Sequence, residues 1–197
     1  TAIGALGTKA VAAYADYEQL VGGVETLFKD SQDQVMDYAN NAYKTAGLSA
    51  NEYMETVTSF SASLLQSLDG DTSAAADKAN LAITDMSDNA NKMGTDMTSI
   101  QNAYQGFAKS NYTMLDNLKL GYGGTQAEME RILADAEKIS GIKYDISSYA
   151  DIVDAIHVVQ TEMGITGTTA EEAASTIQGS FGMMKSAWQN LVTGMAD

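Results

Sequence analysis

The sequence contains no proline and no cysteine, and it has a single histidine. Proline breaks helix interiors because it lacks an N–H and clashes with the preceding turn, so the strongest helix breaker is missing. Without cysteine, the chain can form neither a disulfide framework nor a thiolate metal site. A single histidine removes most zinc and histidine-base chemistry as well. We therefore predict that the chain holds no metal and no cofactor.

Basic residues are scarce, with 11 Lys and Arg against 26 Asp and Glu and a formal net charge of −15. Such a surface repels phosphates, so we expect no tight binding of nucleic acid. It also disfavours docking on anionic lipid. The charge fits either an ordinary solvated acidic surface or a surface along which nucleic acid passes without being bound.

Long hydrophobic runs are also missing, because no stretch approaches the ~20 apolar residues that span a bilayer. The first residues, 1–15, lack the basic start and apolar stretch of a signal peptide. The chain begins at Thr1 rather than at a methionine, so we expect a fragment of a longer protein.

The sequence is rich in helix-forming residues, arranged in periodic segments between glycines. We predict an all-α fold, a compact bundle of about seven to nine helices joined by short glycine-terminated loops. Residues 1–197 are expected to form a single module, with a subdivision near 121–125 as the alternative. The expected helices cover roughly 8–28, 31–46, 50–68, 72–93, 95–107 (with a bent continuation through Leu115 and Leu118), 126–140, 149–163 and a last helix after 169. Residues 142–147 are the least helical stretch.

Three capping boxes support these boundaries, each a Ser or Thr followed by Glu at the third position after it. They begin at Ser49, Thr125 and Thr169. Asp30 or Ser31 is expected to cap the second helix, Thr72 the fourth and Ser148 the seventh. Gly47, Gly94 and Gly141 are expected to end helices.

Two loops have features of ligand-binding motifs. Asp69-Gly70-Asp71 looks like the start of a calcium loop, but its sixth position is Ala74 and its twelfth is Asn80. Residues 121–125 are rich in glycine, but they lack the preceding strand and the lysine of a phosphate loop. We interpret both as turns between helices.

The pairs of aspartates and the single histidine do not indicate a catalytic site either. Asp85 and Asp88 are three residues apart, as are Asp151 and Asp154, and such pairs usually lie on a solvated helix face. His157 has no second histidine with which to share a metal and is expected to be partly buried or exposed. No nucleophile elbow occurs. We therefore predict no catalytic residues and no enzyme activity.

The last predicted helix carries an apolar seam at alternating spacings of four and three, the pattern of a heptad repeat. Its residues are Ile177, Phe181, Met184, Trp188, Leu191 and Met195. One interpretation is an ordinary helix packed on the core. The other is a protein-contact helix that pairs with another copy or continues as a rod. The dispersed tyrosines and methionines favour an ordinary core, with a contact surface as the alternative.

A long ordered series of segments resembles tail tape measure proteins of long-tailed phages and prophages, particularly those of Gram-positive hosts. The segments are YMETVTSF at 53–60, MSDNANKMGTDM at 86–97, IQNAYQGFAK at 100–109, NYTMLDNL at 111–118, LGYGGT at 120–125 and AWQNLVTG at 187–194. The resemblance extends over about 13–197, without a single diagnostic motif.

The resemblance implies a virion structural protein that lies in several copies inside the tail tube and sets tail length. Its implied partners are other copies of itself, tail tube and tail-tip proteins, and the tail chaperones that hold it in the host cytoplasm before assembly. During infection such proteins leave the tube, contact the host envelope transiently and assist ejection of the viral genome. This segment lacks the long uninterrupted heptads of a ruler, so a compact module is expected. The alternative function is an ejected membrane-active or secreted helical effector.

Overall fold

The computed structural model describes the backbone of residues 2–175 and 177–194, and the side chains of 7–175 and 181–194. Within these residues there is no β-strand, which confirms the all-α prediction. The α-helices are α1 (Ala2–Phe28), α2 (Gln32–Thr45), α3 (Ala50–Ser67), α4 (Thr72–Met93), α5 (Met97–Ala108), α6 (Gln126–Ser140), α7 (Tyr149–Glu162), α8 (Thr168–Ser175) and α9 (Ile177–Gly194). Two short 3-10 helices, η1 (Lys29–Ser31) and η2 (Leu115–Leu118), join α1 to α2 and follow α5.

Polar side chains fix most of the helix beginnings. Ser49 forms the complete predicted capping box, since Glu52 N–H donates to its hydroxyl and its own N–H donates to the Glu52 carboxylate. Thr125 accepts from Glu128 N–H, but the Glu128 carboxylate instead accepts from Gly123 N–H. Ser148 caps α7 as predicted. The second capping box therefore forms in half only, because the Glu128 carboxylate accepts from a nearby loop amide.

Other boundaries differ from the predictions. Asp71, rather than Thr72, caps α4, because its carboxylate accepts from Ala74 N–H. Helix α1 begins at Ala2 and runs without a break through Gly22 and Gly23. Helix α5 ends at Ala108 instead of continuing, and η2 is a separate element. The predicted last helix is two helices, α8 and α9.

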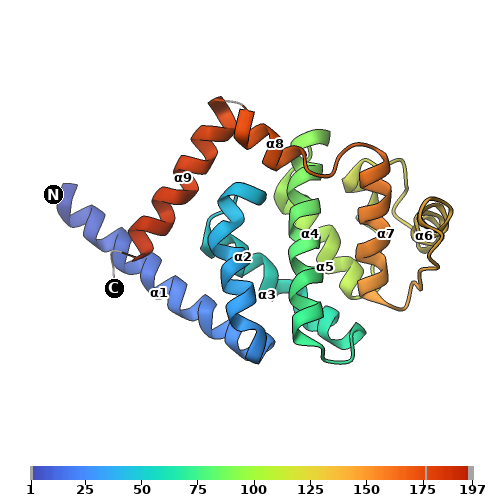
Figure 1. Ribbon diagram of the computed structural model, residues 1–197, viewed down its shortest axis with the longest axis horizontal. Helices are drawn as coiled ribbons and strands as arrows, with labels where there is room; N and C mark the ends of the chain where they lie inside the picture. Colours follow the sequence, from blue (N-terminus) through green and yellow to red (C-terminus); the bar gives the residue numbers. More distant parts are fainter. Residues whose placement is uncertain (1, 176, 195–197) are drawn as a thin grey trace.

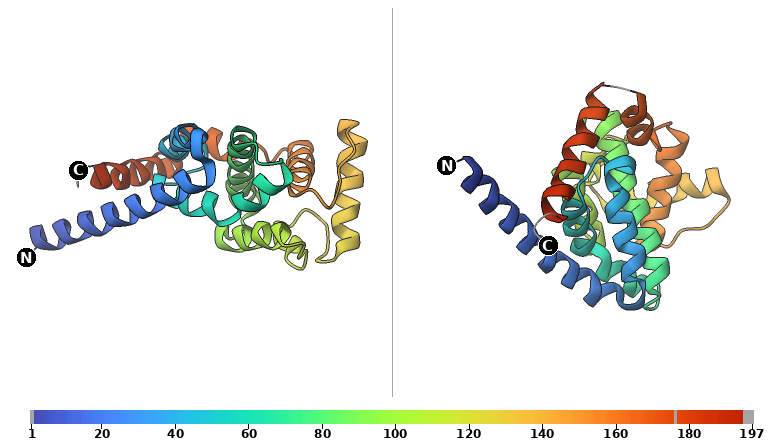
Figure 2. Two further views of the ribbon diagram at one scale, coloured as in Figure 1. Left: turned by 90° about the horizontal axis from the view of Figure 1, so that it is seen from below. Right: turned by 60° about the vertical axis from the view of Figure 1, so that its left-hand side comes forward.

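The helices form a body with two distinct ends (Figure 1). Helix α4 lies in the middle and packs against α2, α3, α5, α7 and α8. At one end, α9 lies against α1, whose N-terminal turns extend beyond the body, and at the other end α6 packs on α7 (Figure 2). The ends are separated along the longest axis of the molecule.

The core is one cluster of buried side chains that runs from Val24 of α1 to Ile165 of the loop before α8. Its largest completely buried members include Tyr53, Tyr104 and Phe107. Buried side chains on both sides of 121–125 belong to this cluster, and both the single module and the alternative subdivision near 121–125 stay predictions. Within the described residues, no helix combines the length and apolar character needed to cross a bilayer.

Candidate interaction surface

Helix α9 turns its apolar side away from the body. Four residues of the predicted seam form this surface, which we name the α9 face: Phe181, Met184, Trp188 and Leu191, exposed by 66%, 63%, 59% and 51%. The core interpretation is therefore wrong for these four side chains, and their role as a protein contact stays a prediction. The side chain of Ile177 and the whole of Met195 lie outside the described part of the chain.

The opposite side of α9 contacts the body, and apart from Met183 it is mostly polar. Ser186 and Thr193 are buried there. The amide oxygen of Asn190 accepts a hydrogen bond of 3.0 Å from Ala50 N–H at the start of α3. Amphipathic helices of globular proteins usually have the reverse orientation, with the apolar side on the core. The orientation of α9 leaves its heptad seam open to a partner.

The charge distribution separates this end from the rest of the molecule. Apart from Asp197, every carboxylate residue lies between Asp16 and Glu172. The charged residues of 2–15 in α1 and of the whole of α9 are thus only two, Lys9 and Lys185. An apolar, weakly basic end therefore projects from an acidic body.

A buried carboxylate on α4 holds the start of α8. Asp88 is completely buried, and its two oxygens accept from Gly167 N–H at 2.7 Å and Thr169 N–H at 2.9 Å. An acceptor for these orphan amides is what an N-cap residue normally supplies from within its own helix. The predicted capping role of Thr169 is wrong, because its buried hydroxyl has no hydrogen-bond partner. Asp88 takes that role from another helix and anchors the chain just before α9.

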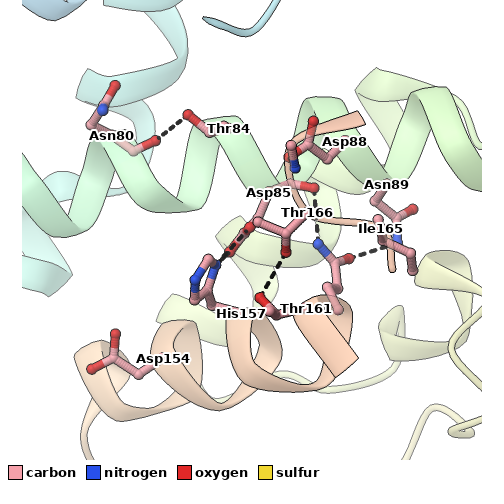
Figure 3. A network of polar contacts seen from close by, with 12 residues as sticks. Asn80, Thr84, Asp85, Asp88, Asn89, Asp154, His157, Thr161, Ile165 and Thr166 are labelled. Atoms are coloured by element: carbon pink, nitrogen blue, oxygen red, sulfur yellow. Dashed lines mark hydrogen bonds and ion pairs between the residues drawn. The ribbon is translucent and has the colours of Figure 1, made fainter. Parts of the chain in front are cut away.

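Next to Asp88, a polar network joins α4 to α7 (Figure 3). Asp85 is buried and lies 2.9 Å and 3.0 Å from Nδ1 of His157 through its two oxygens. The side-chain amide of Gln160 donates to the Asp85 carbonyl, and its oxygen accepts from Asn89, which also donates to the Leu118 carbonyl. The interpretation of Asp85 and Asp88 as a solvated face is wrong, because both face α7 and the loop that follows it.

The protonation of this pair reflects its burial. Burial raises the pKa of Asp85 to about 6, while the hydrogen bond from His157 acts in the opposite direction. The hydrogen bond to Asp85 raises the pKa of His157, and burial opposes it. A buried carboxylate that holds a half-buried imidazole is a strong brace between helices. We interpret the network as the joint that sets the direction in which α8 and α9 leave the body.

The other candidate loops have structural roles. Within the described residues, no group of His, Asp and Glu is arranged to hold a metal ion. Asp69 and Gly70 form the turn before α4, both with positive φ. Asp154 forms an ion pair with Lys78 of α4. Asp151 accepts from Asp145 N–H and so orders the loop before α7.

The opposite end of the molecule carries a feature that sequence reasoning missed. An open groove of about 600 Å³ lies between α6 and the loop before α7, and we name it the α6 groove. Its apolar lining comes from Leu133, Tyr144 and Ile146, and its charged rim includes Glu130 and Glu137. The exposed residues Ile139 and Ile142 lie in the same region of the chain. In the sequence, the available signal was the pair of isoleucines that flank Gly141, at the expected end of a helix.

Comparison with known proteins identifies no relative of this chain: no family model matches it, and neither a curated protein nor a solved structure is significantly similar.

Proposed function

We propose that this chain is a structural assembly module of a phage tail tape measure protein and that it binds other proteins through the α9 face. The observation that carries the proposal is the outward orientation of Phe181, Met184, Trp188 and Leu191 on a helix whose polar side contacts the body. Contiguous exposed apolar side chains mark binding surfaces on soluble proteins. The resemblance of the segments to tape measure proteins supplies the biological setting.

The composition of the α9 face suits a protein partner. Tryptophan, phenylalanine and methionine are enriched in protein interfaces, and tryptophan is a frequent energetic hot spot. Burial of one such side chain contributes on the order of 1.5–3 kcal/mol. Helix α9 carries no carboxylate that a partner would have to desolvate. A narrow seam at heptad spacing favours a helix as the contacting element.

In this proposal the module acts by contact and performs no reaction. Its partners are other copies, tail tube and tail-tip proteins, and the tail chaperone. Before assembly it resides in the host cytoplasm, and afterwards in the tail lumen of the virion. Setting of tail length, assembly of the tube and ejection of the genome belong to the parent protein.

A binding experiment tests the proposal with a matched pair of methionine variants. Met184 lies in the α9 face, and Met163 is an exposed methionine at the end of α7. The tagged chain is used to capture tail tube and tail chaperone proteins of long-tailed phages of Gram-positive hosts. We expect the wild type and Met163→Ser to retain at least one of them, and Met184→Ser and Trp188→Ser to lose it. Retention by none of the proteins, or equal retention by all, overturns the proposal.

The same surface also favours a second candidate, the ejected membrane-active module. An apolar helix face without carboxylates can lie on a lipid surface. The test is release of a dye from neutral phosphatidylcholine vesicles. Leakage that is caused by the wild type and lost in Trp188→Ser favours the membrane-active module, and intact vesicles favour the assembly module.

A further inference from the structure

The two ends of the molecule carry surfaces of opposite character. The α9 face is a convex apolar ridge, with Lys185 directly after Met184 in the chain. The α6 groove is concave, with apolar side chains inside and Glu130 and Glu137 on the same helix. Figures 1 and 2 place α9 and α6 at opposite ends of the longest axis. One copy therefore presents a ridge at one end and a groove at the other.

Charge selects between the ways in which two copies could meet. If two α9 faces met symmetrically, the lysine-bearing ends of both copies would be brought together, and each would remain away from the carboxylates of its partner. If α9 met the body of another copy, an end with Lys9 and Lys185 would face a surface that holds nearly all the carboxylates. Complementary potentials favour the second arrangement.

We propose that the α9 face of one copy docks in the α6 groove of a second copy, so that copies associate head to tail. The inference rests on the proposed function only in treating the α9 face as a protein-docking surface. It names the partner of that surface and the place where the partner is bound.

The lining of the groove matches the ridge. The half-buried side chains of Tyr144 and Ile146 offer apolar surface for Trp188 and Met184. Glu130 and Glu137 are seven residues apart, so they lie on one side of α6, where Lys185 can approach either. Lys143 at the rim faces Asp145 of the same loop, which reduces its repulsion of Lys185.

Two smaller cavities of the described residues are poor receptors for the ridge. One is lined by Asn190 and Thr193 of α9 itself, and the other by Gly182 and Met183 of α9. Both lie beneath the helix that carries the ridge. The α6 groove is the receptor that a second copy can reach without displacing its own α9.

This geometry has a consequence for assembly. A contact between two different surfaces leaves a free ridge at one end of each pair and a free groove at the other. Further copies can then add, so the association continues instead of stopping at a dimer. We expect the average mass of the wild type to rise steadily with concentration.

Complementation between two variants tests the proposal. Trp188→Ser damages the ridge and keeps the groove, while Glu130→Lys with Glu137→Lys damages the groove and keeps the ridge. We expect each variant alone to stay monomeric, with association weakened about tenfold or more. An equimolar mixture should form heterodimers and stop there, because it contains one intact ridge and one intact groove for each pair. Sedimentation velocity measures the masses, and circular dichroism checks that both variants remain folded.

A control variant places the same charge reversal elsewhere. Glu55→Lys with Glu162→Lys changes two exposed carboxylates outside the groove and should associate like the wild type. Association that needs Trp188 but ignores the groove variant overturns the proposal in favour of symmetric pairing. A wild type that stays monomeric also overturns it. If that monomer still captures tail proteins through α9, the proposed function stands alone.

Discussion

Among the described glycines, Gly124 is the one at which backbone packing leaves the least room. A Cβ at this position would lie 2.2 Å from the carbonyl oxygen of Thr113, in the loop that precedes η2. Two backbone segments meet here, and neither can move as a flexible side chain would. Residues 121–125 thus form the loop before α6, and the backbone of this loop packs directly against the loop that leads to η2.

We predict that Gly124→Ala lowers the free energy of unfolding by about 1–3 kcal/mol, because the main chain must shift to admit a methyl group. Gly123→Ala is the control, since its Cβ would meet Glu128 Cγ at an ordinary 3.5 Å. Urea unfolding of the three proteins measures the difference. Equal loss in both variants would contradict the close approach.

Asp85 and His157 give stability a specific dependence on pH. Burial raises the pKa of Asp85 to about 6 from 3.8, so the folded chain keeps a proton that the unfolded chain releases within that window. The raised pKa of His157 acts in the same direction from 6.5 upward. Both contributions to stability therefore fall as pH rises.

Asp85→Asn removes the titrating carboxyl of Asp85 and also the partner that raises the pKa of His157, so both contributions to the pH dependence are lost. We predict that the stability difference, wild type minus variant, is more favourable at about pH 5 than at about pH 8. Urea unfolding at the two pH values measures it, with Asp116→Asn on the surface of η2 as the control. A difference that stays constant or grows with pH would show that the pair does not titrate as described.

The residues also show where sequence reasoning reaches its limit. Ser49 and Ser148 were predictable as caps because a cap and its amides are neighbours in the chain. The role of Asp88 was not, because the amides that donate to its carboxylate lie 79 and 81 residues further on. The spacing of Asp85 and Asp88 indicated a shared helix face but could not indicate what covers that face.

Among the elements, α8 and α9 depend on a small number of anchors. Among its described side chains, α9 buries Ser186 and Thr193, half-buries Met183 and Val192 and exposes the four residues of the α9 face, so limited apolar burial holds this part of the helix. The Asp88 carboxylate at the start of α8 and the Asn190 contact with α3 supply specific attachment. Elements with few buried apolar contacts open at lower free energy than the core.

We predict that Asp88→Ala loosens α8 and α9 while α3 stays protected. Loss of a buried charged acceptor leaves two amides unsatisfied, at a cost of about 1–3 kcal/mol each. Hydrogen exchange should accelerate at Gly167 and Thr169 and along α9. Asp71→Ala removes a cap at the exposed start of α4 and serves as the control. Equal acceleration throughout the chain would indicate global unfolding instead of a local joint.

Element boundaries were predictable where glycine or a local cap marks them. Gly141 ends α6 with a left-handed φ of 74°, as its position predicted. The end of α5 was missed because Ser110 adopts a left-handed conformation, with φ of 57°, that serine does not signal. The different directions of α8 and α9 (Figure 1) were also not predicted, because no proline or glycine lies between their bounds.

At the scale of the whole molecule, periodicity was enough to predict the all-α class but not the arrangement of the helices. The sequence shows that α9 is amphipathic; only packing shows which side faces out. Likewise, the absence of carboxylates from 1–15 and 173–196 becomes meaningful once α1 and α9 are seen side by side. The distance between the ridge and the groove is a property of the assembled body.

We predict that Trp188→Ser changes association far more than stability. An exposed substitution away from core contacts typically alters the free energy of unfolding by no more than about 0.5 kcal/mol. Thermal unfolding in dilute solution should therefore match the wild type. Destabilisation well beyond this range would mean that Trp188 supports the body and that the α9 face is not free for a partner.

Trp188 is the chain's single tryptophan, so its fluorescence reports on the α9 face directly. The most direct test of the α9 face as a docking surface is its emission and acrylamide quenching, measured in dilute solution and again at high concentration or with tail proteins. We predict solvent-exposed emission for the dilute chain, then a blue shift and protection from quenching as partners bind. Emission that stays solvent-exposed and fully quenchable under every condition would contradict the account.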